Sequence, residues 1–392
     1  MLEVVYKKNR HYSLTGRITP ALMAKAFKAV KRNRGAAGID KQSIKMFESN
    51  LSDNLNALMR DLKSGEFQPL PLRRAYIDKG GGKLRPLGIP TVRCRVAQEI
   101  VRSILEPIFE PLFHDHSHGF RKTRSCHTAM DVVVHYRSLG YRYVLDADIK
   151  GFFDNIPHSL IMDLISREIS DSNMLSLIKK FLQAGVMEEG TVRPTLTGTP
   201  QGGIVSPLIA NIVLNHLDWF LEQQGYKFVR YADDFLVFCK SRHQAEKALK
   251  AVTNVIENDL GLTLSPEKTR ITTFGQGFDY LGYYVSAFTI RMSGKAEERF
   301  KGKIKAITCR SHNLDTKVVV KLNRVIRGTV RYFATPFTTA LGQFNTLDQF
   351  IRRRIRCMKY KRIWMTDNGR LQNRYIWRIG FISCRDVYLS AC

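Results

Sequence analysis

The 392-residue sequence lacks a long apolar stretch. No run reaches the roughly 18 residues that a membrane-spanning helix requires. The opening residues, Met1 to Lys8, lack the apolar segment of a secretory signal. Internal repeats and low-complexity linkers are also missing. These absences argue against a membrane protein, a secreted protein and a repeat array.

Cysteine is sparse and follows no ligand pattern. None of the seven cysteines belongs to a Cys-x-x-Cys pair, which argues against a zinc ribbon and a disulfide framework. The tract from His114 to His118 places histidines at alternate positions without a second ligand pair, and it is a poor zinc site. We therefore expect reduced thiols in a cytosolic protein.

Acidic residues are scarce beside basic ones. The chain has 35 Asp+Glu against 62 Lys+Arg, a net charge of +27. Residues 290–392 alone carry 23 basic and 6 acidic residues, or +17. Such an excess suits a polyanion, and with no apolar run we favour nucleic acid over a membrane. We predict a catalytic body at residues 1–287 and a basic helical module at 288–392.

Several of the few acids fall in β-like segments. The segment Tyr231 to Asp234 reads Tyr-Ala-Asp-Asp between apolar β-formers, which predicts a hairpin over 226–239 with both acids at its tip. Asp146 and Asp148 end another β-like run and share one face of it. If the strands are neighbours, these carboxylates form a ligand set for two hard cations. The alternative is an ordinary Asp-rich surface turn.

Two glycine-containing segments suit a nucleotide. Residues 74–90 predict a hairpin whose tip carries Lys79 and Arg85 around three glycines, so that cations and backbone can approach a triphosphate. Gln201 lies on a glycine-flanked loop before a helix that Ser206 is expected to cap, with Pro207 at its first position. Taken alone, these segments are better explained as a solvated loop and a plain helix entry.

Two basic segments are candidate nucleic-acid contacts. The residues around Arg121 form one such patch. Near the C-terminus cations alternate with apolar and aromatic anchors, which favours RNA or DNA contact over a solvated helix face. Its arginines are Arg352, Arg353, Arg354 and Arg356.

In this order, the segments resemble those of reverse transcriptases, specifically the bacterial group II intron-encoded type, the maturases. The resemblance covers about residues 20–365. Its motifs are Ala36 to Asp40, Lys83 to Pro90, Ser117 to Arg121, Asp148 to Asp154, Gly198 to Gly203, Tyr231 to Asp234 and Tyr280 to Gly282. It implies an α+β right-hand polymerase: fingers and palm with a small antiparallel sheet packed by helices, then an α-helical thumb.

The resemblance also implies roles for single residues. Asp148, Asp233 and Asp234 would be catalytic and would hold two Mg²⁺ ions, for which Mn²⁺ can substitute, with the Ile149 carbonyl as a further ligand. Asp146 and Asp154 would support them. The other implied site residues are Lys79 and Arg85 for the triphosphate, Phe153 for excluding a 2′-hydroxyl, Gln201 for the nucleotide pocket, and Tyr280, Leu281 and Gly282 for the primer end.

The implied partners are an RNA template, from an intron or another noncoding RNA, a DNA or RNA primer, and dNTPs, in the bacterial cytoplasm. No His/Cys-rich endonuclease segment follows the thumb, and the short segment after Asp367 leaves splicing assistance open. The alternatives are a domesticated enzyme of phage defence, CRISPR spacer acquisition or DNA repair, and a splicing maturase that acts mainly by binding RNA.

Overall fold

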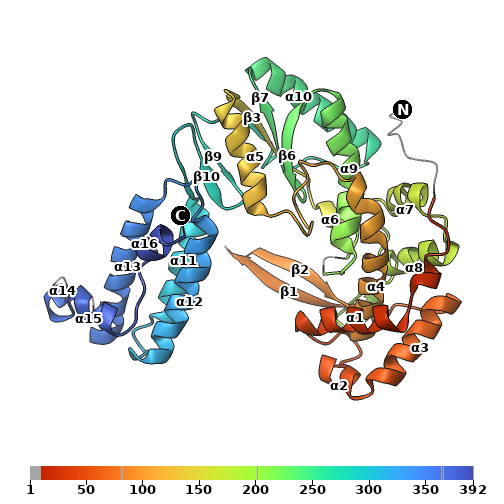
Figure 1. Cartoon of the computed structure of the whole chain (residues 1–392), viewed down its shortest axis with the longest axis horizontal. Coiled ribbons are helices and arrows are strands. Elements are labelled where there is room, and N and C mark those ends of the chain that lie inside the picture. The colour runs from red at the N-terminus through yellow and green to blue at the C-terminus, as the bar shows by residue number, and fades with distance from the viewer. Residues whose placement is uncertain (1–9, 81–82, 201, 363, 365, 392) are drawn as a thin grey trace. The chain divides into compact units, whose positions relative to one another are not determined.

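The computed structural model describes residues 10–80, 83–200, 202–362, 364 and 366–391. It divides the chain into two compact units (Figure 1). The first comprises Met1–Ala129 and Leu145–Ile271, and the second Met130–Val144 and Thr272–Cys392. Within the described ranges, no helix is long and apolar enough to cross a membrane.

The first unit begins with short helices and a long hairpin. Strands β1 (Leu72–Gly80) and β2 (Lys83–Ile89) pair antiparallel, as the sequence predicts. A sheet with the order β2-β1-β4-β5 is completed by β4 (Val186–Glu188) and β5 (Thr191–Arg193). The preceding helices are η1 (Thr15–Arg17), α1 (Pro20–Arg32), α2 (Ile44–Ser49) and α3 (Leu51–Ser64).

A second sheet has the strand order β6-β7-β3-β8. Strands β6 (Lys227–Tyr231) and β7 (Asp234–Cys239) form the predicted hairpin, and β3 (Tyr143–Asp148) lies beside β7. The fourth strand is β8 (Arg270–Thr273). Residues 235–239 of β7 are all buried, because α10 (Arg242–Asn254) packs on this strand and α9 (Ser206–Gln223) packs on β6 (Figure 1).

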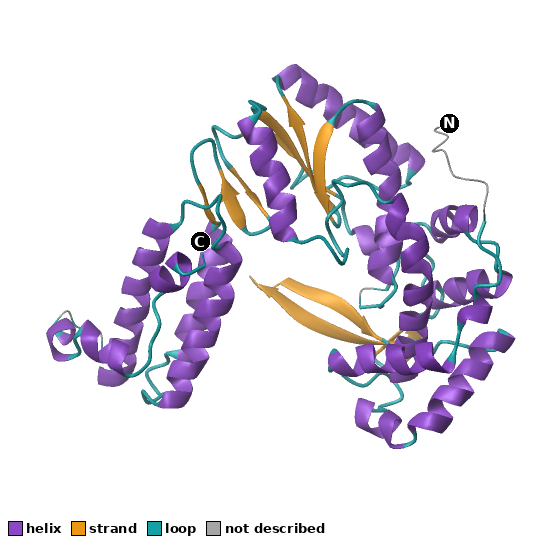
Figure 2. Cartoon of the chain, in the orientation of Figure 1, coloured by secondary structure: helices purple, strands orange, loops and turns teal. Residues whose placement is uncertain are grey.

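Further helices lie between residues 92 and 259 (Figure 2). They are α4 (Val92–Phe109), η2 (Glu110–Leu112), α5 (Cys126–Ser138), α6 (Phe152–Asn155), α7 (His158–Glu168), α8 (Ser172–Leu182) and the π-helical segment η3 (Val255–Asp259).

One helix start differs from the prediction. Ser206 is the first residue inside α9, Val205 is the N-cap, and no side chain caps the helix. The Ser206 hydroxyl instead donates to the Pro200 carbonyl at 2.9 Å. The hydroxyl therefore stabilises the preceding loop rather than the helix end.

The second unit combines a small sheet with helices. Strands β9 (Phe278–Tyr280), β10 (Tyr283–Val285) and β11 (Ile290–Met292) are followed by α11 (Gly294–Ile307), α12 (Thr316–Phe333) and α13 (Leu341–Tyr360). Apolar residues of α12 and α13 recur every three or four positions and are buried, which gives this unit its core. The last helices are α14 (Asp367–Arg370), α15 (Asn373–Arg378) and α16 (Cys384–Leu389), of which α16 packs on α12 and α13.

Candidate active site

A two-residue turn joins β6 to β7. Tyr231 pairs with Asp234 across it, and Ala232 has φ +58°, the left-handed conformation that such turns need. The backbone of Gly119 packs against this turn, so closely that a Cβ there would lie 2.3 Å from the Ala232 nitrogen. Only glycine fits at that position.

The side chain of Arg230 holds the turn in place. Its side chain is fully buried and pairs with the equally buried Asp218 on α9. One Nη1–H donates to the Ala232 carbonyl at 2.9 Å, and Nη2 donates to Ser117 Oγ at 2.7 Å. Because a buried charge needs several such partners, Arg230 connects the turn to α9 and to Ser117.

Four carboxylates gather where β3 ends beside the start of β7. Burial, followed by the neighbouring Asp146, Asp148 and Asp233, raises the pKa of Asp234 to about 8. Burial and then Asp148 also raise the pKa of Asp233. The strand adjacency predicted from the sequence is therefore present, and it concentrates negative charge that water does not screen well.

Two cations that sequence reasoning missed meet this cluster. Lys268 Nζ lies 2.6 Å from Asp148 Oδ2, and Arg270 Nε lies 3.2 Å from Asp146 Oδ2. Lys268 lies just before β8, and Arg270 is the first residue of β8. A hydrogen bond to Asp148 is the main reason that the pKa of Lys268 is raised.

The donor set suits a hard divalent cation, because it consists of carboxylate oxygens. Burial and the three neighbouring carboxylates outweigh Lys268 in their effect on the pKa of Asp234, so the two cations offset the negative charge of the cluster only in part. In the described part of the chain no three acidic, histidine or cysteine side chains are already gathered as a ligand set. Lys268 Nζ contacts one oxygen of Asp148, so a metal ion that bound this oxygen would have to displace the Lys268 side chain. With that displacement, the residues fit a divalent metal.

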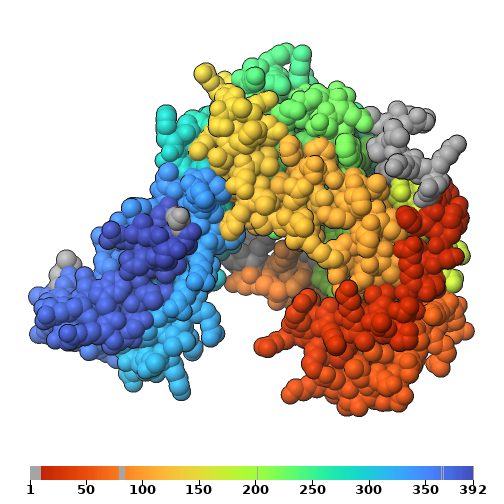
Figure 3. Space-filling view, in the orientation of Figure 1, coloured from red at the N-terminus to blue at the C-terminus, as the bar shows by residue number. Residues whose placement is uncertain are grey.

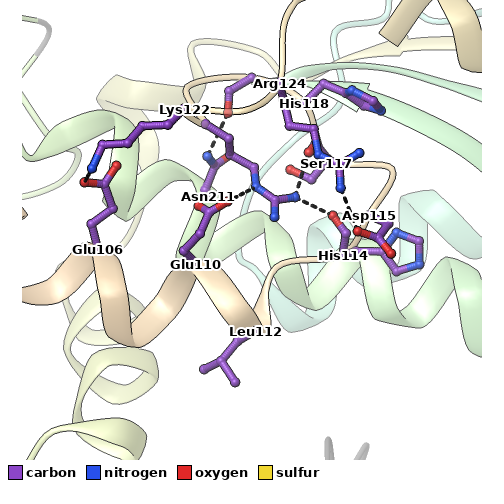
Figure 4. Close-up of polar contacts among 12 residues, drawn as sticks. Glu106, Glu110, Leu112, His114, Asp115, Ser117, His118, Lys122, Arg124 and Asn211 are labelled. Atoms are coloured by element: carbon purple, nitrogen blue, oxygen red, sulfur yellow. Dashed lines mark hydrogen bonds and ion pairs between the residues drawn. The ribbon is translucent and has the colours of Figure 1, made fainter. Parts of the chain in front are cut away.

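The loop at residues 114–124 carries several basic residues, and Figure 4 shows how they are paired. Arg121 Nε donates to Glu110 at 2.8 Å, and its Nη1 donates to the His114 and Ser117 carbonyls at 2.7 and 2.9 Å. Only 6% of the Arg121 side chain is exposed. These contacts lie within the protein, and a nucleic-acid contact by Arg121 remains a prediction.

The histidines of this loop are packing residues. His114 makes ring contacts with His116, Trp219 and Phe228. His118 Nδ1 lies 2.8 Å from Thr128 Oγ1, and burial followed by nearby arginines lowers the pKa of His118 to about 4. These contacts lie in the protein interior, and the expectation that this tract is no zinc site stays a prediction.

Phe120 is a large apolar residue in this loop, yet half of it is exposed. It has φ +61°, which is rare for a bulky residue. Its ring meets that of Phe153 edge to face at 6.3 Å, and Phe153 in turn contacts Phe152 at 5.4 Å. Sequence reasoning did not single out Phe120, since its unusual backbone carries no sequence signal beyond the preceding glycine.

The predicted nucleotide residues are only partly described. Gln201 and the side chain of Lys79 lie outside the described residues. Arg85 stands on β2 opposite Ile77, and its charge acts to lower the pKa of Asp233 against the larger effect of burial. Gly202 has φ +111° and abuts the Gly88 carbonyl, which fixes this loop against β2.

Comparison with known proteins identifies the family. The family model described as reverse transcriptase (RNA-dependent DNA polymerase) matches residues 77–285, more than half of the chain. The chain belongs to the reverse transcriptase family. The predicted mixed α+β fold of these enzymes is thereby confirmed, and family membership implies use of a divalent metal.

Two relatives connect this reverse transcriptase to group II introns. Protein YkfC of Escherichia coli is 34% identical over 304 residues, 67% of this chain and 80% of YkfC. Group II intron-encoded protein LtrA of Lactococcus lactis is 35% identical over 352 residues, 72% of this chain and 58% of LtrA. The group II intron maturase-specific domain matches residues 297–376. A solved Candida albicans telomerase, bound to a fragment of telomeric RNA, covers 86% of this chain and 66% of its own at 13% identity and a TM-score of 0.46.

The second unit of the reverse transcriptase contains the remaining predicted residues. Tyr280 ends β9, and Leu281 and Gly282 form the turn to β10. The Tyr332 hydroxyl donates to the Leu281 carbonyl at 2.8 Å. On α13, Arg354 donates to the Thr308 carbonyl at 2.7 Å, and Arg356 donates to Leu371 and Asn373. The primer and template roles of these residues stay predictions.

Proposed function

We propose that this chain copies RNA into DNA, with its active centre at the carboxylates of β3 and β7. The observation that carries the proposal is the convergence of the partly buried Asp146, Asp148, Asp233 and Asp234 beside a turn that Arg230 and Gly119 hold in place. A protein that only binds RNA has no physical need for such a cluster, because mutual repulsion of partly buried carboxylates destabilises the fold.

In this proposal Asp148, Asp233 and Asp234 hold two Mg²⁺ ions, or Mn²⁺ in their place, with the Ile149 carbonyl as a further ligand. When bound, the ions supply the charge that lowers the pKa of a primer 3′-hydroxyl and neutralises the triphosphate. Asp146 supports the ligands and is itself oriented by Arg270 at 3.2 Å. Asp154, whose carbonyl accepts from the Thr197 hydroxyl at 3.1 Å, holds the neighbouring loop.

Other side chains would bind and select the nucleotide. Lys79 and Arg85 would contact its triphosphate, and Gln201 would line the pocket. Phe153 would occupy the space that a 2′-hydroxyl needs, with Phe120 against its edge. Tyr280, Leu281 and Gly282 would position the primer end.

The maturase-specific match over residues 297–376 favours an intron RNA as the partner. We propose that the second unit binds this RNA in the bacterial cytoplasm, with a DNA or RNA primer and dNTPs as the other substrates. The same match favours a second activity, assistance in splicing. Sequencing RNA that co-purifies with the protein tests the partner: a structured intron supports the proposal, whereas a short CRISPR or defence-associated RNA contradicts it.

Asp233→Ala tests the catalytic proposal. Incorporation of dTTP on poly(rA)/oligo(dT) with Mg²⁺ should fall about a thousandfold or more, because a charge-stabilising ligand is lost. Asp163→Ala, which removes an exposed acid on α7, should leave incorporation unchanged.

A second readout separates lost catalysis from misfolding. In EDTA the Asp233→Ala variant should be at least as heat-stable as the wild type, since one repelling carboxylate is gone. Mg²⁺ should raise the melting temperature of the wild type more than that of the variant. Incorporation near the wild-type rate would overturn the assignment of the centre.

A further inference from the structure

A basic pocket lies in the second unit, where α13 meets α14. Its volume is about 710 Å³, within the range of about 300–1,000 Å³ that small-molecule sites occupy. The residues that matter here are Arg352, Arg353, Arg356, Arg362, Trp364 and Asp367. In the space-filling view this part of the chain forms one continuous C-terminal surface (Figure 3).

Two arginines build the walls of the pocket. Arg362 Nη2 lies 3.1 Å from Oδ1 of Asp367, a carboxylate that is almost fully buried. Arg356 donates through Nε to the Leu371 carbonyl at 3.0 Å and through Nη2 to Asn373 Oδ1 at 2.8 Å. The polypeptide on the far side of the pocket is thus fixed to α13.

Two further arginines are left without a direct partner. Within the described residues, Arg352 and Arg353 make no hydrogen bond and no ion pair, and Asp367 is already engaged by Arg362. Lys301, which also lines the pocket, is paired with Glu297. Arg352 acts electrostatically on Asp348, a buried acid one turn earlier on α13, but neither arginine pairs directly with an acid in the described part of the chain. The pocket therefore presents positive charge that is offset only in part, which suits phosphate.

Trp364 adds a stacking surface. Its side chain is 63% exposed, and the guanidinium carbon of Arg362 lies 4.8 Å from its ring centre. An exposed tryptophan beside guanidinium groups is the combination that holds an unpaired base and its phosphate, because stacking tolerates any base while the cations hold the backbone.

We propose that this pocket takes an unpaired nucleotide of RNA, with the base on Trp364 and the adjoining phosphates at Arg352 and Arg353. The inference rests on the proposed RNA binding of the second unit and extends it from general phosphate contact to a specific structural feature, a bulged or looped-out nucleotide. A duplex without such a nucleotide has no exposed base face to stack.

Fluorescence anisotropy with the full chain tests the proposal on two RNA hairpins, one with a single bulged uridine and one fully paired. Trp364→Ala should weaken binding of the bulged hairpin about tenfold and of the paired hairpin less than twofold. Trp364→Phe should restore most of the affinity, because it restores a ring. Removal of the ring should also abolish most of the change in tryptophan fluorescence that the bulged hairpin produces.

Arginine variants supply the matched comparison. Arg353→Ala should reduce the salt dependence of binding by about one unit of the logarithmic slope. Arg370→Ala, which removes an exposed arginine outside the pocket lining, should reduce it less.

Three outcomes would overturn the proposed role of the pocket. Trp364→Ala could lower the affinity for both hairpins equally or for neither, or Arg353→Ala and Arg370→Ala could change the salt slope equally. The broader proposal fails in a different way. If the wild type binds neither hairpin, RNA binding by the second unit is wrong. Retained dTTP incorporation on a preannealed primer then still supports the catalytic centre.

Discussion

The loop at residues 114–124 and helix α13 are both rich in basic residues, yet they use them differently. In the loop, Arg121, Lys122 and Arg124 each pair with an acid at 2.7–2.8 Å. On α13, Arg352 and Arg353 have no such partner within the described residues. A basic residue becomes structural where the fold brings an acid to it, and is left for phosphate where the fold does not.

The positions of the acidic residues explain why the basic residues of the loop are paired and those two arginines of α13 are not. Glu106 and Glu110 stand at the end of α4 and just after it, facing the loop, and Asp115 belongs to the loop itself (Figure 4). The region after residue 290 has only 6 acids for 23 basic residues, so most of its cations cannot be neutralised internally. Local charge in the sequence is therefore a weak guide to nucleic-acid contact unless the distant partners are known.

The largest expected effect lies beneath the loop, at the buried pair of Arg230 and Asp218. Asp218→Ala leaves the Arg230 charge buried without its partner, which should lower the free energy of unfolding by about 3–5 kcal/mol. Urea unfolding followed by circular dichroism measures this loss. The double variant Arg230→Met/Asp218→Leu removes both charges and should recover much of it.

An exposed ion pair provides the control for this prediction. Asp163→Ala breaks the surface pair with Arg167 and should cost less than about 1 kcal/mol. If Asp218→Ala costs no more than Asp163→Ala, the pair is not a structural anchor, and the contrast between paired and unpaired arginines loses its strongest case.

The sequence predicted the parts of the site that depend on local pattern. The apolar β-formers on both sides of the Tyr-Ala-Asp-Asp turn predicted the β6–β7 hairpin, and the β-like run before Asp146 predicted β3. The adjacency of β3 and β7 was a hypothesis that the structure bears out. The expected cap at Ser206 was wrong, because its hydroxyl finds a partner in the preceding loop.

What could not be predicted depends on long-range contacts. Lys268 meets Asp148 across 120 positions, and nothing near either residue indicates the pairing. Arg121 points inward because Glu110 accepts a hydrogen bond from it. Arg353 is unpaired because the fold places no acid within reach of it among the described residues. The left-handed backbone of Phe120 lies directly after Gly119, whose backbone packs on a turn more than 100 positions away in the sequence. These features follow from the fold rather than from any local sequence signal.

Phe120 sharpens the comparison, since it is an exposed side chain in an otherwise internally bonded loop. If it holds Phe153 in place, Phe120→Ala should raise the ratio of ribonucleotide to deoxyribonucleotide incorporation several-fold, and Phe153→Ala should raise it at least about tenfold. A tenfold change in this ratio corresponds to a change of about 1.4 kcal/mol in the difference between the two activation free energies.

Single-nucleotide kinetics with dTTP and UTP on the same primer measures both ratios. Phe120→Leu retains a bulky group and should give an intermediate value. An unchanged ratio with Phe153→Ala would place the selection elsewhere, with Phe152 as the next candidate. An unchanged ratio with Phe120→Ala alone would limit Phe120 to packing.

The smallest effects should separate the arginines of α13 from one another. Replacing Arg352 and Arg353 together should reduce the logarithmic salt slope of RNA binding by about two while leaving stability nearly unchanged. Arg354 donates to the Thr308 carbonyl at 2.7 Å and to its hydroxyl at 3.1 Å. Arg354→Ala should therefore cost about 1 kcal/mol of stability and leave the slope close to that of the wild type. The salt slope of RNA binding and the free energy of unfolding should both be measured on the same preparations, because an unpaired arginine changes the slope and a paired one changes the stability. If Arg354→Ala reduces the slope as much as a single replacement of Arg352 or Arg353 does, internal pairing does not keep an arginine from contacting phosphate. The distinction between the two regions then fails.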